Sequence, residues 1–83
     1  MISNSPNPFS NFTTFEFTIN ESGHTKIGLF SLEGVELKVI FDEYTIPGKY
    51  RFIWDSGIII PGIYFYKITS GINCKVEKMI IIK

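Results

Sequence analysis

The sequence predicts an all-β protein, a small antiparallel β-sandwich of about seven short strands. Three observations point to this fold. Apolar and polar residues alternate with a period of two in successive runs of the chain. Turns rich in Gly, Pro and Asn separate these runs at a spacing of roughly ten to twelve residues. β-Branched and aromatic residues dominate while alanine is absent, which favours strands over helices.

Length and charge limit the possible classes of protein. The chain of 83 residues is expected to form a single domain, residues 1–83. Eight basic and eight acidic residues are scattered along it, which argues against binding to nucleic acid or an anionic membrane surface. No apolar run approaches the roughly 18 residues of a membrane-spanning helix, and residues 1–4 lack the features of a secretory signal. If the protein is exported, we expect this domain to belong to a longer chain.

Residues 4–9 are expected to form an extended segment at the edge of a sheet. Pro6 and Pro8 remove two ladder donors, and each biases the residue before it towards extended geometry. We expect Phe9 and Phe12 to close one end of the core.

Three half-buried strands follow in the prediction, at residues 14–19, 25–31 and 35–41. Residues predicted to point inwards are Phe15, Phe17, Ile19, Ile27 and Leu29, while Val35, Leu37, Val39 and Phe41 share one face of the third strand. Gly28 weakens its strand and suggests close packing by a neighbour. Gly34 is expected to form the hairpin turn before the third strand.

Two Pro-Gly pairs are expected to begin strands. Residues 42–49 are predicted to form the longest irregular connection, and this connection contains Pro47-Gly48. Pro61-Gly62 repeats the pattern. Proline has no donor and glycine reaches left-handed conformations, so each pair interrupts one ladder and precedes the next.

Large aromatic residues share one face of the strands that follow these pairs: Tyr50, Phe52, Trp54, Tyr64 and Tyr66. An exposed row of such rings would stack on sugars. Core packing is the preferred interpretation, because so small a domain has few other large residues to bury. Tyr64 also has the pattern of a tyrosine corner, in which a tyrosine that opens a late strand bonds back to the upstream backbone.

The last predicted strand, residues 74–82, is apolar on both faces at its end. The residues concerned are Lys78, Met79, Ile80, Ile81, Ile82 and Lys83. One interpretation is that this strand lies inside its sheet and that a loop covers its outer side. The other is that the outer apolar residues form a docking surface, with the free backbone captured by strand addition. We expect these six residues to be a site of partner recognition.

No catalytic, cofactor-binding or metal-binding constellation is visible, so the protein is not expected to be an enzyme. His24 and Cys74 have no sequence neighbours that would complete a metal set or a nucleophile pair. Calcium binding by Asp42, Glu43 and Asp55 is a weaker alternative to an ordinary solvated loop. The glycosylation sequons at Asn11 and Asn20 are short enough to occur by chance.

Taken together, these motifs resemble the C-terminal sorting domain of proteins exported by the type IX (Por) secretion system of Bacteroidetes, in its type A form. The resemblance covers nearly everything from residue 7 to residue 83. It depends on the opening residues Asn7, Pro8 and Phe9, on the run at residues 14–17, on Gly34, on Trp54-Asp55, on residues 61–67 with Gly62 and Tyr64, and on residues 78–83. The order and spacing of these motifs carry the resemblance.

The resemblance implies an immunoglobulin-like sandwich at the C-terminus of a secreted cargo protein. Such a domain is recognised by the outer-membrane translocon, and a sortase-like peptidase removes it or exchanges it for a surface anchor. The expected location is the outer-membrane surface or the extracellular medium. Exposed strand edges also suggest a strand-exchanged dimer when the domain is isolated.

One departure and two alternatives accompany this resemblance. The hairpin at residues 30–35 lacks the Tyr-Asp before its glycine and the basic residue after it that are common in the family. The immunoglobulin-like domain of the flagellar hook-capping protein shares parts of the Gly-x-Tyr pattern. A different class of function is a structural, adhesive or carbohydrate-binding accessory domain.

Overall fold

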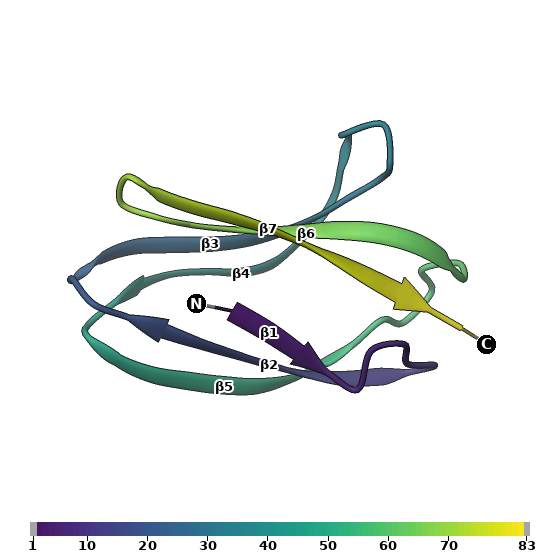
Figure 1. Ribbon diagram of the computed structural model, residues 1–83, viewed down its shortest axis with the longest axis horizontal. Coiled ribbons are helices and arrows are strands. Elements are labelled where there is room, and N and C mark those ends of the chain that lie inside the picture. The colour runs from purple at the N-terminus through teal and green to yellow at the C-terminus, as the bar shows by residue number, and fades with distance from the viewer. Residues whose placement is uncertain (1, 83) are drawn as a thin grey trace.

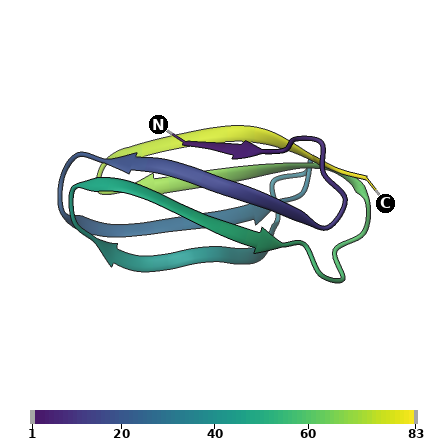
Figure 2. The same ribbon diagram turned by 90° about the horizontal axis from the view of Figure 1, so that it is seen from below.

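Two antiparallel sheets lie face to face in the computed structural model, which describes residues 2–82 (Figure 1). The strands are β1 (Ile2–Ser5), β2 (Phe12–Ile19), β3 (Gly23–Phe30), β4 (Glu36–Thr45), β5 (Gly48–Asp55), β6 (Gly62–Ser70) and β7 (Asn73–Ile81). One sheet has the order β1-β2-β5 and the other β4-β3-β6-β7. Seen from below, β1 and β7 follow one side of the sandwich and β4 and β5 the other (Figure 2). The predicted all-β sandwich is confirmed.

Strand β2 is the centre of the three-stranded sheet. Phe15 pairs with Asn4 of β1 and Phe52 of β5. The alternation along β2 is as predicted, because Phe15, Phe17 and Ile19 are buried while Glu16 and Thr18 are exposed. Phe12 lies on the same outward face as Glu16 and Thr18 and is 57% exposed. The prediction that Phe12 helps to close the core is therefore wrong, whereas Phe9 is buried as expected.

Strand β3 is covered by β4 on one edge and β6 on the other. Ile27 and Leu29 are fully buried, as predicted. A Cβ atom added at Gly28 would come within 3.0 Å of the Glu36 carboxylate and the Phe30 ring, so this glycine does permit a close approach.

Strand β4 differs from its prediction in both length and exposure. It runs to Thr45 and β5 begins at Gly48, so residues 42–49 are not a long irregular connection. Pairing of β4 with β3 continues up to this turn, which extends the ladder. The apolar side chains Val35, Leu37 and Val39 are exposed rather than packed. Leu37 and Val39 lie where the register of β4 against β3 shifts twice, and Val35 lies in the turn before β4.

The core is built largely from aromatic rings. Phe15 is fully buried, and its ring centroid lies 5.5 Å from that of Phe52, 6.1 Å from Trp54 and 5.1 Å from Tyr66. Tyr50 stacks on Phe17 at 5.1 Å. The preferred interpretation of these rings as core is confirmed, and they form no exposed row on which sugars would stack.

The two Pro-Gly pairs form a repeated structural motif, Ile-Pro-Gly-x-Tyr. The Tyr64 hydroxyl donates to the Ile60 carbonyl at 2.5 Å, which is the predicted tyrosine corner. The Tyr50 hydroxyl makes the same bond to the Ile46 carbonyl at 2.7 Å, and the Ile46 amide donates back to it at 2.9 Å. Strands β5 and β6 begin at the glycine of each pair, as predicted. Each tyrosine thus fixes the turn from which its own strand starts.

Removing the Tyr64 hydroxyl tests this motif. Tyr64 is 8% exposed, so Tyr64→Phe leaves a partly buried carbonyl without its donor and is expected to lower the free energy of unfolding by about 1 to 2 kcal/mol. Tyr50→Phe is expected to cost less than about 1 kcal/mol, because water replaces its exposed bond. Urea unfolding followed by Trp54 fluorescence measures both. An equal or larger loss for Tyr50→Phe would contradict this ranking.

Candidate recognition surface at the C-terminal strand

Strand β7 divides its side chains between the core and the surface. Met79 and Ile81 are 0% and 1% exposed and pack in the core. On the other face, Lys78 and Ile82 are exposed and Ile80 is half-buried. Lys83, the last residue of the predicted recognition site, lies outside the described residues.

β7 lies at the edge of its sheet, so the interpretation that it lies inside the sheet is wrong. It pairs with β6 through its whole length, and no other strand among residues 2–82 forms a ladder with it. Its final residues nevertheless have a second neighbour, since Phe9 forms an isolated parallel bridge with Ile81.

Asn7 and Phe9 bind the outer edge of β7. The Asn7 side-chain amide donates to the Lys78 carbonyl at 3.1 Å and accepts from the Ile80 amide at 3.0 Å. The Phe9 amide donates to the Ile80 carbonyl at 3.1 Å, and the Ile82 amide donates to the Phe9 carbonyl at 2.7 Å. The opening motif and the closing motif of the sequence therefore form one structural unit.

The local sequence explains why Asn7 makes these bonds with its side chain. Pro6 and Pro8 have no N–H group, so this segment cannot form a continuous ladder. An asparagine side chain carries both a donor and an acceptor and replaces the missing peptide contacts. The Phe9 ring anchors the segment, since it is 3% exposed and lies 6.3 Å from the Trp54 ring. Thr13 fixes the preceding turn by donating to the Pro6 carbonyl at 2.9 Å.

The other residues on which the family resemblance depends contribute to the fold and not to the surface of β7. Trp54 and Tyr64 are buried in the core, and Gly62 begins β6 directly opposite Ile81. Gly34 lies in the β3–β4 turn with φ of +88°, a left-handed conformation that side chains other than glycine rarely adopt. This turn connects β3 to the edge strand β4, and Gly34 lines the same hollow as Val76 of β7, but none of the predicted recognition residues 78–82 lines that hollow.

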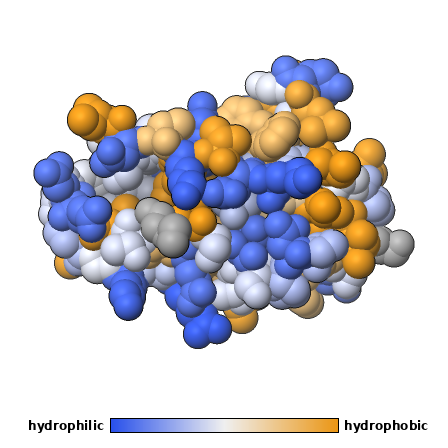
Figure 3. All heavy atoms as spheres, viewed as in Figure 1, coloured by the Kyte–Doolittle hydropathy of each residue, from blue (hydrophilic) through white to orange (hydrophobic). Residues whose placement is uncertain are grey.

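The outer face of the four-stranded sheet carries apolar side chains that sequence reasoning did not single out. Ile63 pairs with Ile80, and Phe30 pairs with Phe65. A shallow hollow of about 380 Å³ is lined by Phe30, Ser31, Leu32, Glu33, Gly34, Phe65, Lys67 and Val76. Apolar residues also gather at the end of the molecule where β7 and the β5–β6 loop lie, and hydrophilic residues cross the middle of the same view (Figure 3). Ile58 in that loop is 99% exposed and Ile82 is 52% exposed.

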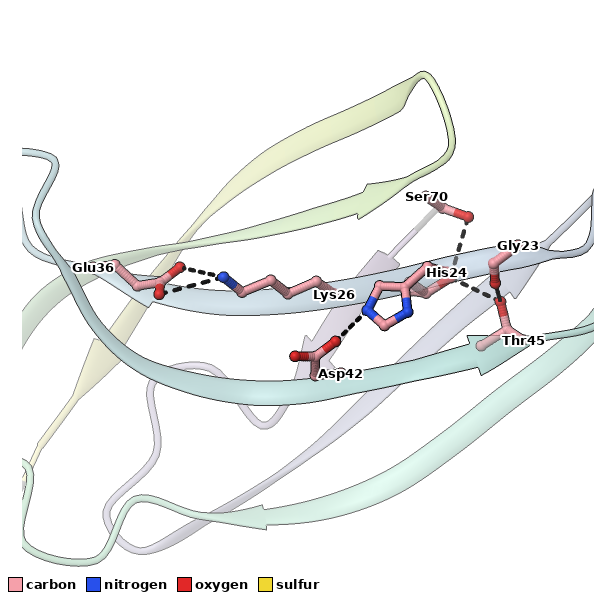
Figure 4. A network of polar contacts seen from close by, with 8 residues as sticks. Gly23, His24, Lys26, Glu36, Asp42, Thr45 and Ser70 are labelled. Atoms are coloured by element: carbon pink, nitrogen blue, oxygen red, sulfur yellow. Dashed lines mark hydrogen bonds and ion pairs between the residues drawn. The ribbon is translucent and has the colours of Figure 1, made fainter.

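A polar network connects β3 to its two neighbours (Figure 4). The buried Thr25 hydroxyl lies 2.8 Å from that of Thr45 and donates to Ser70 at 3.2 Å. The exposed His24 ring is hydrogen-bonded to the Asp42 carboxylate. These contacts give the hydroxyl groups of Thr25, Thr45 and Ser70 hydrogen-bond partners. They do not pair a nucleophile with a base.

The candidate calcium ligands are separated in the fold. Asp42 and Glu43 belong to β4 rather than to a loop, and Asp55 accepts a hydrogen bond from the Gly57 amide at 2.8 Å. Within residues 2–82 no group of three or more His, Cys, Asp or Glu side chains is arranged to hold a metal ion. Cys74 is a free, exposed thiol at the start of β7. The described part of the chain contains no helix able to span a membrane.

Among residues 2–82, only Tyr66, in the middle of β6, has a clearly displaced pKa. Burial, and to a smaller extent the Glu77 carboxylate on β7, raise the pKa of Tyr66 from 10.0 to about 12. The folded state therefore favours the neutral phenol, and this contribution to stability is complete below about pH 10 and is lost as the pH rises through about 12. Urea unfolding at increasing pH should show this loss, and Tyr66→Phe should remove that part of it. A variant with the same alkaline profile as the wild type would contradict the assignment.

Comparisons with known proteins give one match. A family model described as the secretion system C-terminal sorting domain matches residues 5–83. The matched range contains both the segment formed by Asn7, Pro8 and Phe9 and the whole of β7. Neither the curated proteins nor the solved structures include a match to this chain.

Proposed function

The chain belongs to the family of secretion system C-terminal sorting domains, and from this premise we propose that the type IX machinery recognises its folded sandwich on a cargo protein. Family membership implies a C-terminal sorting signal for type IX secretion. It also implies a secreted protein, either attached to the cell surface or extracellular.

The finer steps form the rest of the proposal. The domain follows the cargo, is bound by the outer-membrane translocon, and is then removed or exchanged for a surface anchor by a sortase-like peptidase. Its own role is recognition and not catalysis. The cargo supplies any enzymatic activity of the full protein.

The division of β7 between core and surface supports the proposal best. Met79 and Ile81 hold the strand in place through buried contacts, so the strand keeps one conformation. Lys78, Ile80 and Ile82 then present a fixed row of side chains to a partner. The core contacts of Met79 and Ile81 are made with other residues of this sandwich, so we expect the same row to be presented on different cargo proteins.

Substituting the outward row tests recognition without disturbing the core. The combined variant Lys78→Ala, Ile80→Thr and Ile82→Thr retains Met79 and Ile81 and is expected to lower the rate of export of a cargo fusion by about tenfold or more. The readout is carrier fluorescence in the medium and on the surface of a host with type IX machinery. A cooperative thermal melt of the purified variant checks that it is folded.

The opposite edge strand offers a matched control. Leu37→Thr, Lys38→Ala and Val39→Thr change the same chemistry on β4, where all three side chains are exposed. This control should be exported at the wild-type rate. Equal export of the β7 variant and the β4 control would contradict recognition through the outward row.

A further inference from the structure

Asn7 occupies the edge of β7 at the point where an incoming strand would reach the end of the domain. The two groups that it binds, the Lys78 carbonyl and the Ile80 amide, point away from β6. In an edge strand such groups pair with the peptide units of another strand. Asn7 imitates one peptide unit, and does so with an exposed side chain.

Among residues 2–82, no strand forms a ladder with the rest of this edge, although β1 of the other sheet lies close to β7. Asn73, Cys74, Lys75 and Val76 are all exposed, and β7 pairs here only with β6. Because the backbone groups of alternate residues face the same way, Val76 directs its amide and carbonyl outwards as Ile80 does. An extended segment placed along residues 74–80 would therefore meet a continuous row of backbone donors and acceptors.

Asn7 and Phe9 are held with very different strength. The Phe9 ring is buried beside Trp54, so displacing it would expose a large apolar side chain to water. Displacing the Asn7 side chain exchanges two hydrogen bonds for those of an incoming backbone or of water. Phe9 therefore stays bound at Ile82 and ends the accessible part of the β7 edge there. The hydrogen bonds of the Asn7 side chain, in contrast, can be replaced by those of a competing strand.

We propose that the sorting partner contributes an extended segment that adds to β7 along residues 74–80. This segment replaces the Asn7 side chain as the hydrogen-bond partner of the Lys78 carbonyl and the Ile80 amide. This inference rests on the proposed function and specifies how the same strand is recognised. Main-chain hydrogen bonds supply most of the affinity in this mode, and alternate side chains supply selectivity. The partner segment carries apolar residues at alternate positions, because Val76 and Ile80 lie on the outer face beside it.

Two substitutions with opposite expected effects test the proposal. Val76→Pro removes the outward N–H group, which is tolerated in an edge strand, and is expected to lower the export rate of a cargo fusion by about tenfold or more. Val76→Thr keeps that N–H group and is the matched control.

Asn7→Ala removes the side chain that occupies the edge of β7 before a partner binds. It is expected to raise the hydrogen-exchange rate of the Ile80 amide by about tenfold, with export as fast as wild type or faster.

The outcomes separate this inference from the sorting role itself. If the wild-type fusion is not exported through the type IX machinery, the sorting role fails. If the wild type is exported and Val76→Pro matches Val76→Thr, strand addition at this edge is wrong. Slower export of Asn7→Ala, with the Ile80 amide exchanging faster, would mean that the partner contacts Asn7 instead of displacing it. A wild-type dimer that Val76→Pro abolishes would make a second copy the occupant of the edge and overturn the proposal.

Discussion

Replacing Phe15 with alanine is expected to lower the free energy of unfolding by about 3 to 5 kcal/mol. Phe15 is 0% exposed and contacts three aromatic rings, two from β5 and one from β6. Its ring thereby joins the two sheets, and its removal leaves a cavity that neighbouring rings cannot fill without moving off their own contacts. A domain of this length has a total stability of roughly 4 to 12 kcal/mol, so the loss is a large fraction of the whole.

Phe12 provides the matched control for this prediction. It lies in the same strand but is 57% exposed, so Phe12→Ala is expected to change stability by no more than about 0.5 kcal/mol. Urea denaturation of the purified domain, followed by near-ultraviolet circular dichroism, measures both variants. Comparable losses at the two positions would contradict the assignment of Phe15 to the inter-sheet core.

A chain that ends at Glu77 is expected not to fold at about 37 °C. The truncation removes Met79 and Ile81, which are 0% and 1% exposed, and each such loss costs about 2 to 5 kcal/mol. It also removes every bond that holds Asn7 and Phe9. The combined loss is comparable with the total stability of the domain.

This expectation decides how export experiments are designed. Loss of export after deleting residues 78–83 would reflect unfolding as much as lost recognition, since the deleted strand is half core and half surface. The variant confined to Lys78, Ile80 and Ile82 avoids this ambiguity. A cooperative thermal transition in the chain that ends at Glu77 would show instead that β7 contributes little to the core.

Local patterns in the sequence were sufficient to predict most of the strands. The period of two along residues 14–19 correctly placed Phe15 and Phe17 inside, because alternation within a strand determines which face each side chain occupies. The tyrosine-corner pattern at Tyr64 likewise predicted a bond to the upstream backbone, and the structure places the acceptor at Ile60, four positions before it.

Features that depend on distant neighbours were not predictable in this way. Whether β4 or β7 is an edge strand depends on sheet order, which periodicity does not encode. The bonds between Asn7 and β7 join residues more than seventy positions apart, so no local pattern indicates them. The exposure of Phe12 followed from its strand beginning earlier than predicted.

The repeated Ile-Pro-Gly-x-Tyr motif includes one feature that was predicted from the sequence and one that was not. Sequence alone indicated that both Pro-Gly pairs begin strands, which the structure confirms. The length of the connection around Pro47 was overestimated, because the Tyr50 hydroxyl closes a tight turn through bonds to both backbone groups of Ile46. The signal for that second corner was present in the spacing from Ile46 to Tyr50, which equals the spacing from Ile60 to Tyr64.

Export of a carrier protein tests the central claim most directly. Residues 1–83 are fused behind a signal peptide and a fluorescent carrier, and fluorescence on the surface and in the medium is compared in hosts with and without the type IX machinery. The sorting role predicts export of the fusion only in the host that has the machinery. Periplasmic retention of a well-folded fusion in that host, or equal export from both hosts, would contradict it.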